Sequence, residues 1–163
     1  MVLLTRGKDK GLLDRLRALG IEAAEVALLE QVDLPGLEVL PGRLLQADWV
    51  AVTSKEGAKR LLWAWEKAGR PLLRVAVERV EVYATREREL SPEELALLER
   101  AQVVAFFSPS AARAYALKTP RRPKAACIGP STGEEARRLG FAVWEAAEPG
   151  LEGLFQAILR ALS

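Results

Sequence analysis

Residues 103–117 read VVAFFSPSAARAYAL, and residues 125–140 read AACIGPSTGEEARRLG. Each stretch opens with a short apolar run, breaks at Ser, Pro or Gly, and continues with the apolar spacing of a helix. In the second stretch, Gly140 stands where a left-handed residue commonly ends a helix. Two such units in succession predict parallel strands, because the helix between them returns the chain to the same edge of the sheet. The predicted strands are Val103–Phe107 and Ala125–Ile128, and the predicted helices are Ala111–Leu117 and Thr132–Leu139.

The same alternation extends outward toward both ends of the chain. Ser91-Pro92-Glu93-Glu94 has the features of a helix start, with an N-cap Ser, a Pro and a Glu that closes a capping box. Ser54 is placed to cap another helix, which Gly69 ends. Strands that alternate with helices of this length predict a parallel α/β sheet covered on both faces. The further predicted strands are Val2–Thr5, Ile21–Leu28, Trp49–Thr53, Leu72–Val77, Val80–Ala84 and Phe141–Trp144; the further helices are Gly11–Leu19, Leu44–Ala47, Lys55–Ala68, Pro92–Ala101 and Leu151–Leu162, with a loop from Leu34 to Gly42.

The composition limits the chemistry that the chain can perform. Half of the 163 residues are apolar, and the sequence contains one Cys and no His. The lack of imidazole excludes Ser-His-Asp and Cys-His nucleophile systems, and one thiol can build neither an intrachain disulfide nor a zinc or iron–sulfur site. We therefore expect a reducing compartment, the cytoplasm. The net charge of +2 does not favour nucleic acid as a partner, and no apolar run is long enough to span a membrane.

Small hydroxyl and glycine residues follow four of the predicted strands. Ligands of open α/β sheets bind beyond the carboxyl ends of the strands, and each of these segments precedes a helix whose unpaired N–H groups favour phosphate or carboxylate. The alternative at each position is plain helix capping. No P-loop is present and no Gly-x-Gly-x-x-Gly follows the first strand, so a nucleotide cofactor has no specific support. The four segments are Thr5-Arg6-Gly7, Thr53-Ser54, Ser108-Pro109-Ser110 and Ile128-Gly129-Pro130-Ser131-Thr132.

Four further side chains have more than one interpretation. Tyr83 lies in VEVYAT, where the chain crosses between two α/β stretches. Its phenol could donate a proton or a hydrogen bond in a crevice, or it could be an ordinary aromatic on a half-buried strand. Trp63 and Trp65 stand two residues apart on one helix and cannot share a face, so we expect one of them to be exposed at an interface. Cys127 is interpreted as a small buried side chain.

The two opening stretches resemble the C-terminal part of the uroporphyrinogen-III synthase family. Phe107-Ser108-Pro109-Ser110 matches the end of one family strand, and Ile128-Gly129-Pro130-Ser131-Thr132 matches the end of the next. The resemblance implies two parallel α/β domains joined by a two-stranded ladder, the first of them flavodoxin-like or Rossmann-like and built from both chain ends. Shorter agreements follow the family order at Thr5-Arg6, Val52-Thr53-Ser54, Val82-Tyr83-Ala84-Thr85 and the C-terminal AAEPGLEGLFQAIL.

The resemblance also implies an activity and a set of site residues. Members of this family close the linear tetrapyrrole hydroxymethylbilane into uroporphyrinogen III, inverting the last pyrrole ring, and use no cofactor or metal. The hydroxymethyl group leaves as water, and a spiro intermediate allows the ring to turn over. By resemblance, Ser108, Ser110, Gly129, Ser131 and Thr132 bind substrate carboxylates, Thr5 and Arg6 form the facing wall, Thr53 and Ser54 represent the other domain, and Tyr83 assists departure of the hydroxyl.

The middle of the chain is shorter than the family pattern. After Leu72–Val77 a family member continues through a turn, a helix, a strand and another helix, whereas Tyr83 follows here almost at once. We therefore expect residues 1–33 and 86–163 to form the main domain, and residues 34–85 to form a shortened second lobe with the ladder. Three interpretations remain: a working synthase, a catalytically inactive paralogue that binds a tetrapyrrole or a protein, and a homodimer in which a second copy replaces the missing lobe.

Overall fold

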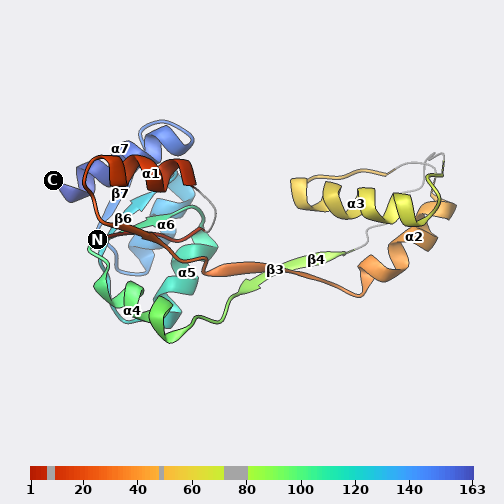
Figure 1. Ribbon diagram of the computed structural model, residues 1–163, viewed down its shortest axis with the longest axis horizontal. Helices are drawn as coiled ribbons and strands as arrows, with labels where there is room; N and C mark the ends of the chain where they lie inside the picture. The colour runs from red at the N-terminus through yellow and green to blue at the C-terminus, as the bar shows by residue number, and fades with distance from the viewer. Residues whose placement is uncertain (7–9, 48–49, 72–80) are drawn as a thin grey trace. The chain divides into compact units, whose positions relative to one another are not determined.

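A computed structural model describes residues 1–6, 10–47, 50–71 and 81–163 (Figure 1). Packing divides the chain into two compact units, each described here by itself. The sheet unit comprises Met1–Glu30 and Glu87–Ser163, and the inserted unit comprises Gln31–Arg86. The predicted strand Leu72–Val77 lies outside the described residues. Among the helices that are described, none has the length and apolar character needed to cross a membrane.

The sheet unit is built on five parallel strands in the order β2-β1-β5-β6-β7. This is the flavodoxin-like order, and it confirms the predicted parallel α/β fold. The strand order reverses between β1 and β5, and ligands of such sheets bind beyond the strand ends at that point. The strands are β1 (Val2–Leu4), β2 (Ala23–Glu25), β5 (Val103–Phe106), β6 (Lys124–Cys127) and β7 (Val143–Glu145).

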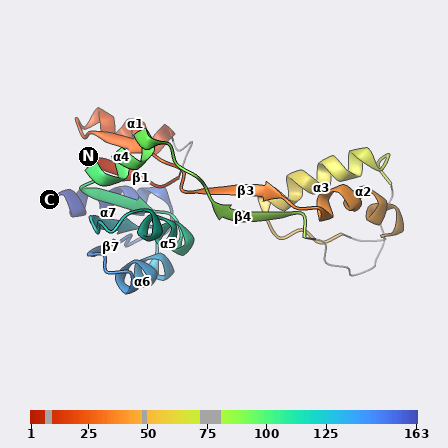
Figure 2. The ribbon, with the colours of Figure 1, turned by 90° about the horizontal axis from the view of Figure 1, so that it is seen from below.

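Helices lie on both sides of this sheet (Figures 1 and 2). Successive strand residues point to opposite faces, so Val2 and Leu4 of β1 pack in one hydrophobic cluster and Leu3 packs in the other. Helices α1 (Lys10–Ala18) and α7 (Leu151–Leu162) contribute to the first cluster. The second cluster includes residues of α4 (Pro92–Arg100), α5 (Pro109–Lys118) and α6 (Pro130–Arg138). The capping box predicted for α4 is present, because Ser91 and Glu94 each accept a hydrogen bond from the other's backbone N–H.

Three aromatic rings fill the second cluster. Phe106, Tyr115 and Phe141 meet edge to face, with ring centroids 5.2–5.8 Å apart. The Tyr115 hydroxyl donates to the Leu98 carbonyl at 2.9 Å, so the buried phenol is satisfied. Cys127 is buried in the same cluster, as its apolar surroundings in the sequence predict, and burial raises the pKa of its thiol to about 12.

The inserted unit contains α2 (Gly36–Gln46) and α3 (Lys55–Lys67), and the chain enters and leaves it through β3 (Leu29–Asp33) and β4 (Tyr83–Glu87). The two strands form a two-stranded sheet. Beyond their ends, the Leu34 N–H donates to the Val82 carbonyl at 2.9 Å and the Arg88 N–H donates to the Leu28 carbonyl at 2.8 Å. Between these two contacts, one strand advances by six residues while the other goes back by six, so the strands are antiparallel. In this register Asp33 lies opposite Tyr83.

Helix α2 is a correction to the sequence prediction, which placed a loop at Leu34–Gly42 and a short helix at 44–47. The helix begins at Gly36 and continues through Pro41 and Gly42. Pro41 has no N–H to donate, so the helix loses one internal hydrogen bond there. Burial of Leu40 and Leu44 against Ala64 of α3 keeps the helix continuous despite this loss.

Three strand predictions were also wrong in part. The predicted strand Trp49–Thr53 is absent over residues 50–53, where Val52 is 45% exposed. Its Val-rich composition resembles a buried strand, but no strand among the described residues pairs with residues 50–53. The predicted Ile21–Leu28 shrinks to β2, and β3 follows where no strand was predicted. Tyr83 begins β4, whereas the sequence placed it near the end of a strand.

Candidate functional site

The first group of candidate residues lies in the sheet unit, at the reversal of strand order. Arg6 follows β1 and Phe107 follows β5, which is the neighbouring strand. The side chain of Arg6 is exposed, and its Cζ lies 5.6 Å from the centroid of the Phe107 ring. This cation–π contact keeps a solvent-accessible positive charge at the carboxyl ends of the two central strands. The sequence singled out Arg6 but gave no sign of its contact with Phe107.

Thr5, the first residue after β1, is almost fully buried. Only 4% of its surface is exposed, and its hydroxyl donates to the Ala105 carbonyl at 2.7 Å. The Thr5 N–H donates to the same carbonyl at 3.2 Å. Thr5 therefore joins β1 to β5, and this contact positions the neighbouring Arg6 beside Phe107.

The N-terminus of α5 carries Ser108 and Ser110. Ser108 is the N-cap, and its hydroxyl accepts from the Ala111 N–H at 3.1 Å. The capping alternative therefore holds for the Ser108 side chain. The Ser110 hydroxyl accepts from the Arg113 guanidinium at 3.2 Å. In the first turn of α5, Pro109 has no N–H, and the Ala111 N–H already donates to Ser108. The Ser110 N–H is therefore the donor of this turn that can bind a ligand.

The N-terminus of α6 is left more open. Gly129 occupies the N-cap position, and no side chain caps this helix. A methyl group added at Gly129 would meet no described residue within 4 Å. The N–H groups of Ser131 and Thr132 occupy the first turn, where no carbonyl of the helix can accept from them. Ser131 is exposed, whereas Thr132 is 2% exposed and buried beneath the turn.

Charged side chains surround these two helix starts. Glu145, at the end of β7, lies against Gly133 in the first turn of α6 and pairs with Arg137 at 2.6 Å. Glu135 of α6 pairs with Arg138 at 2.6 Å and with Arg113 of α5 at 3.2 Å. Each carboxylate is therefore balanced by a guanidinium, and neither leaves uncompensated negative charge to repel an anion. The contact between Glu135 and Arg113 joins two helices, and no local pattern in the sequence connects these two residues.

The Glu135 contacts predict a pH-dependent stability. Hydrogen bonds from Arg138 and then Arg113 hold the pKa of this carboxyl at about 2, below its ordinary value of 4.5. The ionised carboxylate therefore stabilises the fold above about pH 4.5, and this contribution is lost as the pH falls toward 2. We expect Glu135→Gln to be less stable than wild type at pH 7, with the difference shrinking below pH 4.5 in urea unfolding. An Arg138→Ala background should weaken this pH dependence, and a difference that is constant with pH would contradict the assignment.

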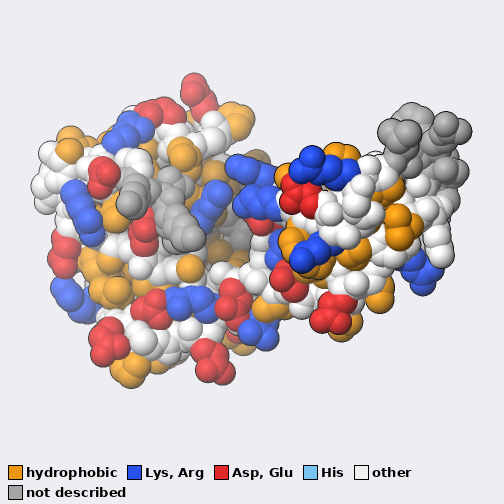
Figure 3. All heavy atoms as spheres, turned by 45° about the vertical axis from the view of Figure 1, so that its right-hand side comes forward, with side chains coloured by type: hydrophobic (Ala, Val, Ile, Leu, Met, Phe, Trp, Pro, Cys, Tyr) orange, Lys and Arg blue, Asp and Glu red, His pale blue; other side chains and the backbone are white. Residues whose placement is uncertain are grey.

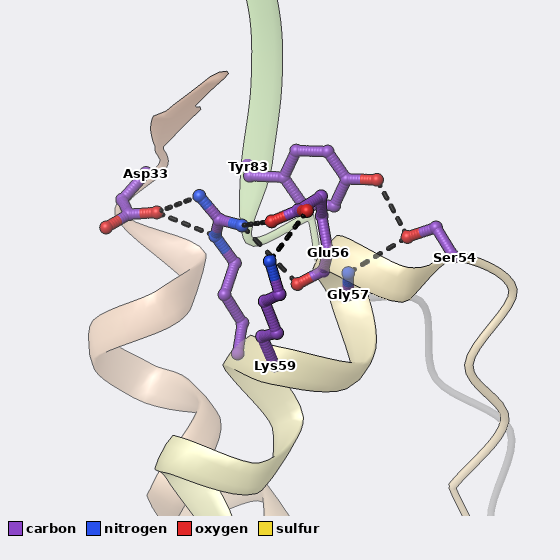
Figure 4. Close-up of polar contacts among 7 residues, drawn as sticks. Asp33, Ser54, Glu56, Gly57, Lys59 and Tyr83 are labelled. Carbon is purple, nitrogen blue, oxygen red and sulfur yellow. Dashed lines mark hydrogen bonds and ion pairs between the residues drawn. The ribbon is translucent and has the colours of Figure 1, made fainter. Parts of the chain in front are cut away.

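The second group of candidate residues lies in the inserted unit, at the N-terminus of α3 (Figure 4). The Ser54 and Tyr83 hydroxyl oxygens are 2.7 Å apart, and Ser54 also accepts from the Gly57 N–H at 2.9 Å. A methyl group at Gly57 would lie 2.9 Å from the Ser54 oxygen and 3.1 Å from a Val52 methyl, so glycine is required for this close approach. Thr53 is exposed beside the pair. The predicted cap at Ser54 is thus confirmed, and the same oxygen binds the Tyr83 phenol.

A cluster of charged residues that the sequence did not single out surrounds Tyr83. The Cζ of Arg60 lies 4.6 Å from the centroid of the Tyr83 ring. Arg60 pairs with Asp33 at 2.6 Å and with Glu56 at 3.6 Å, and Lys59 pairs with Glu56 at 3.0 Å (Figure 4). The helical spacing of Glu56, Lys59 and Arg60 could have revealed part of this cluster. Asp33 lies 27 positions before Arg60, and no local pattern connects them.

The structure therefore brings the candidate residues together in two groups. Around the strand and helix ends of the sheet unit lie Thr5, Arg6, Ser108, Ser110, Gly129, Ser131 and Thr132. In the inserted unit, Ser54 contacts Tyr83 directly, and Thr53 precedes Ser54 in the chain. The first group presents a cation and helix N–H groups, which suit carboxylates, and the second presents a phenol held by a hydroxyl.

Comparison with known proteins gives relatives for both the sequence and the fold. The uroporphyrinogen III synthase of Thermus thermophilus has a TM-score of 0.55 at 15% identity, with 100% of both chains covered. A selenomethionine mutant of the uroporphyrinogen III synthase from the same bacterium has a TM-score of 0.59, also at 15% identity, covering 99% of this chain and 98% of the other. At this identity the likeness shows the fold alone, and no curated protein matches the chain.

The sequence match to the family covers just over half of the chain. A sequence model described as uroporphyrinogen-III synthase HemD matches residues 72–156. This range contains Tyr83 and both strand-to-helix turns of the sheet unit, at 108–110 and 129–132. On this match, the chain belongs to the uroporphyrinogen-III synthase family.

Proposed function

We propose that this protein is a lyase that closes hydroxymethylbilane to uroporphyrinogen III with inversion of the last pyrrole ring. The observation that supports this most is that the family match runs through Tyr83 and both carboxylate-binding turns. No cofactor or metal takes part in the proposed reaction. The enzyme has to hold the substrate so that one ring closure is favoured over another, which is catalysis by positioning.

In this proposal the sheet unit binds substrate carboxylates. A tetrapyrrole with eight carboxylates can use several anion sites at once. Arg6 supplies one full positive charge, while the N–H groups of Ser110, Ser131 and Thr132 supply the partial positive charge of two helix N-termini. Gly129 has no side chain to obstruct a carboxylate at the start of α6, and no side chain caps this helix.

Tyr83 assists departure of the hydroxyl group in this proposal. The Ser54 oxygen already accepts from Gly57, and it can donate its own proton to the Tyr83 oxygen. The Tyr83 proton is then available to the leaving hydroxyl, which departs as water. Joining the methylene to the pyrrole carbon releases one proton, so the overall reaction loses one water and Tyr83 is reprotonated.

The test is an isomer analysis of the product. Purified protein is mixed with enzymatically made hydroxymethylbilane, and the uroporphyrin isomers are separated after oxidation. We expect isomer III with the protein and isomer I in a parallel reaction without it, since spontaneous closure does not invert the ring. Isomer I alone, formed at the spontaneous rate, would rule out the synthase activity.

The inserted unit favours a second candidate, a catalytically inactive paralogue that binds a tetrapyrrole or a protein. Its described residues form two helices and ladder strands, without the predicted strand at residues 50–53. A protein of this kind would bind uroporphyrin, measured by quenching of tryptophan fluorescence, while producing isomer I alone. The two measurements together distinguish the candidates.

A homodimer remains part of the proposal, and nucleic acid does not. Trp63 is 42% exposed on α3, while the Trp65 indole N–H donates to the Pro71 carbonyl at 3.0 Å, so Trp63 is the better candidate for a contact between copies. A light-scattering mass decides the subunit number.

Acidic and basic side chains are interspersed on the face shown in Figure 3, which does not favour a polyanionic strand as partner. The free thiol of Cys127 suits a cytoplasmic location.

A further inference from the structure

Arg60 is a cation with an unusually enclosed side chain. Only 15% of the side chain is exposed, although charged side chains are usually solvated. It extends from α3 to the face of the Tyr83 ring, with Cζ 4.6 Å from the ring centroid. An arginine in this position restricts how far the ring can move on one side.

Two carboxylates fix the guanidinium. The Nε of Arg60 donates to Asp33 Oδ1 at 2.7 Å, and an Nη of Arg60 lies 2.6 Å from the same oxygen. The other Nη donates to the Glu56 carbonyl at 3.4 Å and lies 3.6 Å from a Glu56 carboxylate oxygen. Asp33 belongs to β3 and lies opposite Tyr83 in the ladder. The strand that neighbours Tyr83 therefore also holds the arginine that stacks on it.

These contacts hold Tyr83 at two points. Ser54, the N-cap of α3, binds the hydroxyl oxygen at 2.7 Å, and Arg60, almost two turns further along the helix, covers the ring. A tyrosine side chain has two main torsions, and contacts at the hydroxyl and at the ring face together fix both. Both contacts come from α3, so the helix acts as the support for the phenol.

We infer that Arg60, oriented by Asp33 and Glu56, is a positioning residue that fixes the ring and hydroxyl of Tyr83. The consequence for ring closure rests on the proposed function. If the phenol delivers a proton to the leaving hydroxyl, displacing the ring lowers kcat. KM stays near its wild-type value, because the substrate carboxylates bind to the sheet unit. A purely structural role for Arg60, as a link between α3 and β3, would lower stability and leave the orientation of the Tyr83 ring unchanged.

The first measurement observes the ring without reference to activity. The chain has two tyrosines, Tyr83 and Tyr115, so protein made with ring-labelled 13C-tyrosine gives two sets of ring resonances, assigned with Tyr83→Phe. We expect Arg60→Met to shift the Tyr83 resonances and to weaken the nuclear Overhauser contact between the Tyr83 ring and Gly57, which lies beside it. Loss of the nearby charge alone would shift the resonances and keep that contact. The Tyr115 resonances should stay in place, because Tyr115 is buried in the sheet unit. Asp33→Asn should produce a smaller shift in the same direction.

The matched control is Arg70→Met. Arg70 also stacks on an aromatic ring near α3, with Cζ 5.7 Å from the Trp65 ring, and it pairs with Glu66 at 3.7 Å. The same substitution there removes a cation–π contact and an ion pair but should not move the Tyr83 resonances. Far-ultraviolet circular dichroism checks that the helices are folded in each variant, and Arg60→Lys provides a milder replacement if Arg60→Met unfolds the unit.

The second measurement separates kcat from KM. We expect Arg60→Met to lower kcat for isomer III about two- to thirty-fold, the range of a cation–π contact, with KM within about twofold of wild type. Arg60→Lys should recover part of the rate, because it keeps the charge without the planar stack. Arg70→Met should retain the wild-type rate.

Two outcomes would overturn the inference. The first is a folded Arg60→Met protein whose Tyr83 ring keeps its wild-type contact with Gly57, because the position of the ring would then not depend on Arg60. The second is a shifted ring with an unchanged kcat in a chain that makes isomer III, because position would then not matter for the reaction. If wild type makes isomer I alone, the proposed function fails, and the resonance measurement still decides whether Arg60 positions Tyr83.

Discussion

Tyr83→Phe is expected to lower the rate of isomer III formation about a hundredfold, with KM within about threefold of wild type. The substitution removes one oxygen and leaves the ring, so the Arg60 stack is retained and only the proton donor is lost. Ser54 keeps its hydrogen bond from Gly57 and stays in place. The measurement is the initial rate of isomer III formation, together with the ratio of isomers III and I. Since the substrate also closes spontaneously, the ratio should fall toward isomer I.

Tyr115→Phe provides the matched control for this substitution. It removes the same oxygen from the other tyrosine of the chain, whose hydroxyl donates to the buried Leu98 carbonyl. Leaving that acceptor unpaired costs about 1–3 kcal/mol of stability. The rate of isomer III formation should stay at the wild-type value below the melting temperature. An equal loss of rate in both variants would point to stability, and a wild-type rate in Tyr83→Phe would remove Tyr83 from the mechanism.

The sheet unit could be predicted from the sequence because its signals are local. The run at 103–107 is apolar at every position, as a strand buried on both faces requires, and β5 occupies it to within one residue. Ser91 and Ser108 act as N-caps through hydrogen bonds that span only three residues. Gly140 has a φ of 90°, the left-handed conformation expected after α6. A short window of sequence therefore contains the information that defines each of these elements.

The inserted unit was harder to predict because its elements depend on distant contacts. Pro41 and Gly42 predict a break, yet α2 continues because Leu40 and Leu44 pack against Ala64 of the next helix. Val52 lies in a Val-rich segment that has the composition of a strand, but it is 45% exposed. Propensity describes a residue alone, whereas packing across the helix pair decides the conformation at Pro41 and Gly42.

The candidate site shows the same division between local and distant information. The sequence predicted which segments end strands and begin helices, and these segments are where Ser108 and Gly129 are found. It could not predict that Thr5 bonds to Ala105, 100 positions away, or that Arg60 reaches Asp33. Local pattern thus predicts where helix N–H groups are offered, and tertiary contacts decide which polar side chains remain available to a ligand.

Phe106→Ala is expected to destabilise the sheet unit by about 3–5 kcal/mol, a large share of the about 5–15 kcal/mol by which domains are typically stable. The Phe106 ring is fully buried and contacts both Tyr115 and Phe141 edge to face, at 5.7 and 5.2 Å between centroids. Removing it leaves a cavity between β5 and α5 that the rigid neighbouring rings cannot fill. Urea unfolding followed by circular dichroism measures the change in the free energy of unfolding.

Phe107→Ala makes the same chemical change one residue later and is the matched control. Phe107 is half-buried and faces the other side of the sheet, beside Arg6, so its loss should cost only about 1–2 kcal/mol. A second readout comes from Cys127, which pairs with Phe106 in the sheet and whose buried thiol has a pKa of about 12. Because such a thiol reacts with a disulfide reagent only when the core opens, Phe106→Ala should speed its labelling at least about a hundredfold, and Phe107→Ala far less. Equal labelling rates in the two variants would show that the aromatic cluster does not hold this face of the sheet closed.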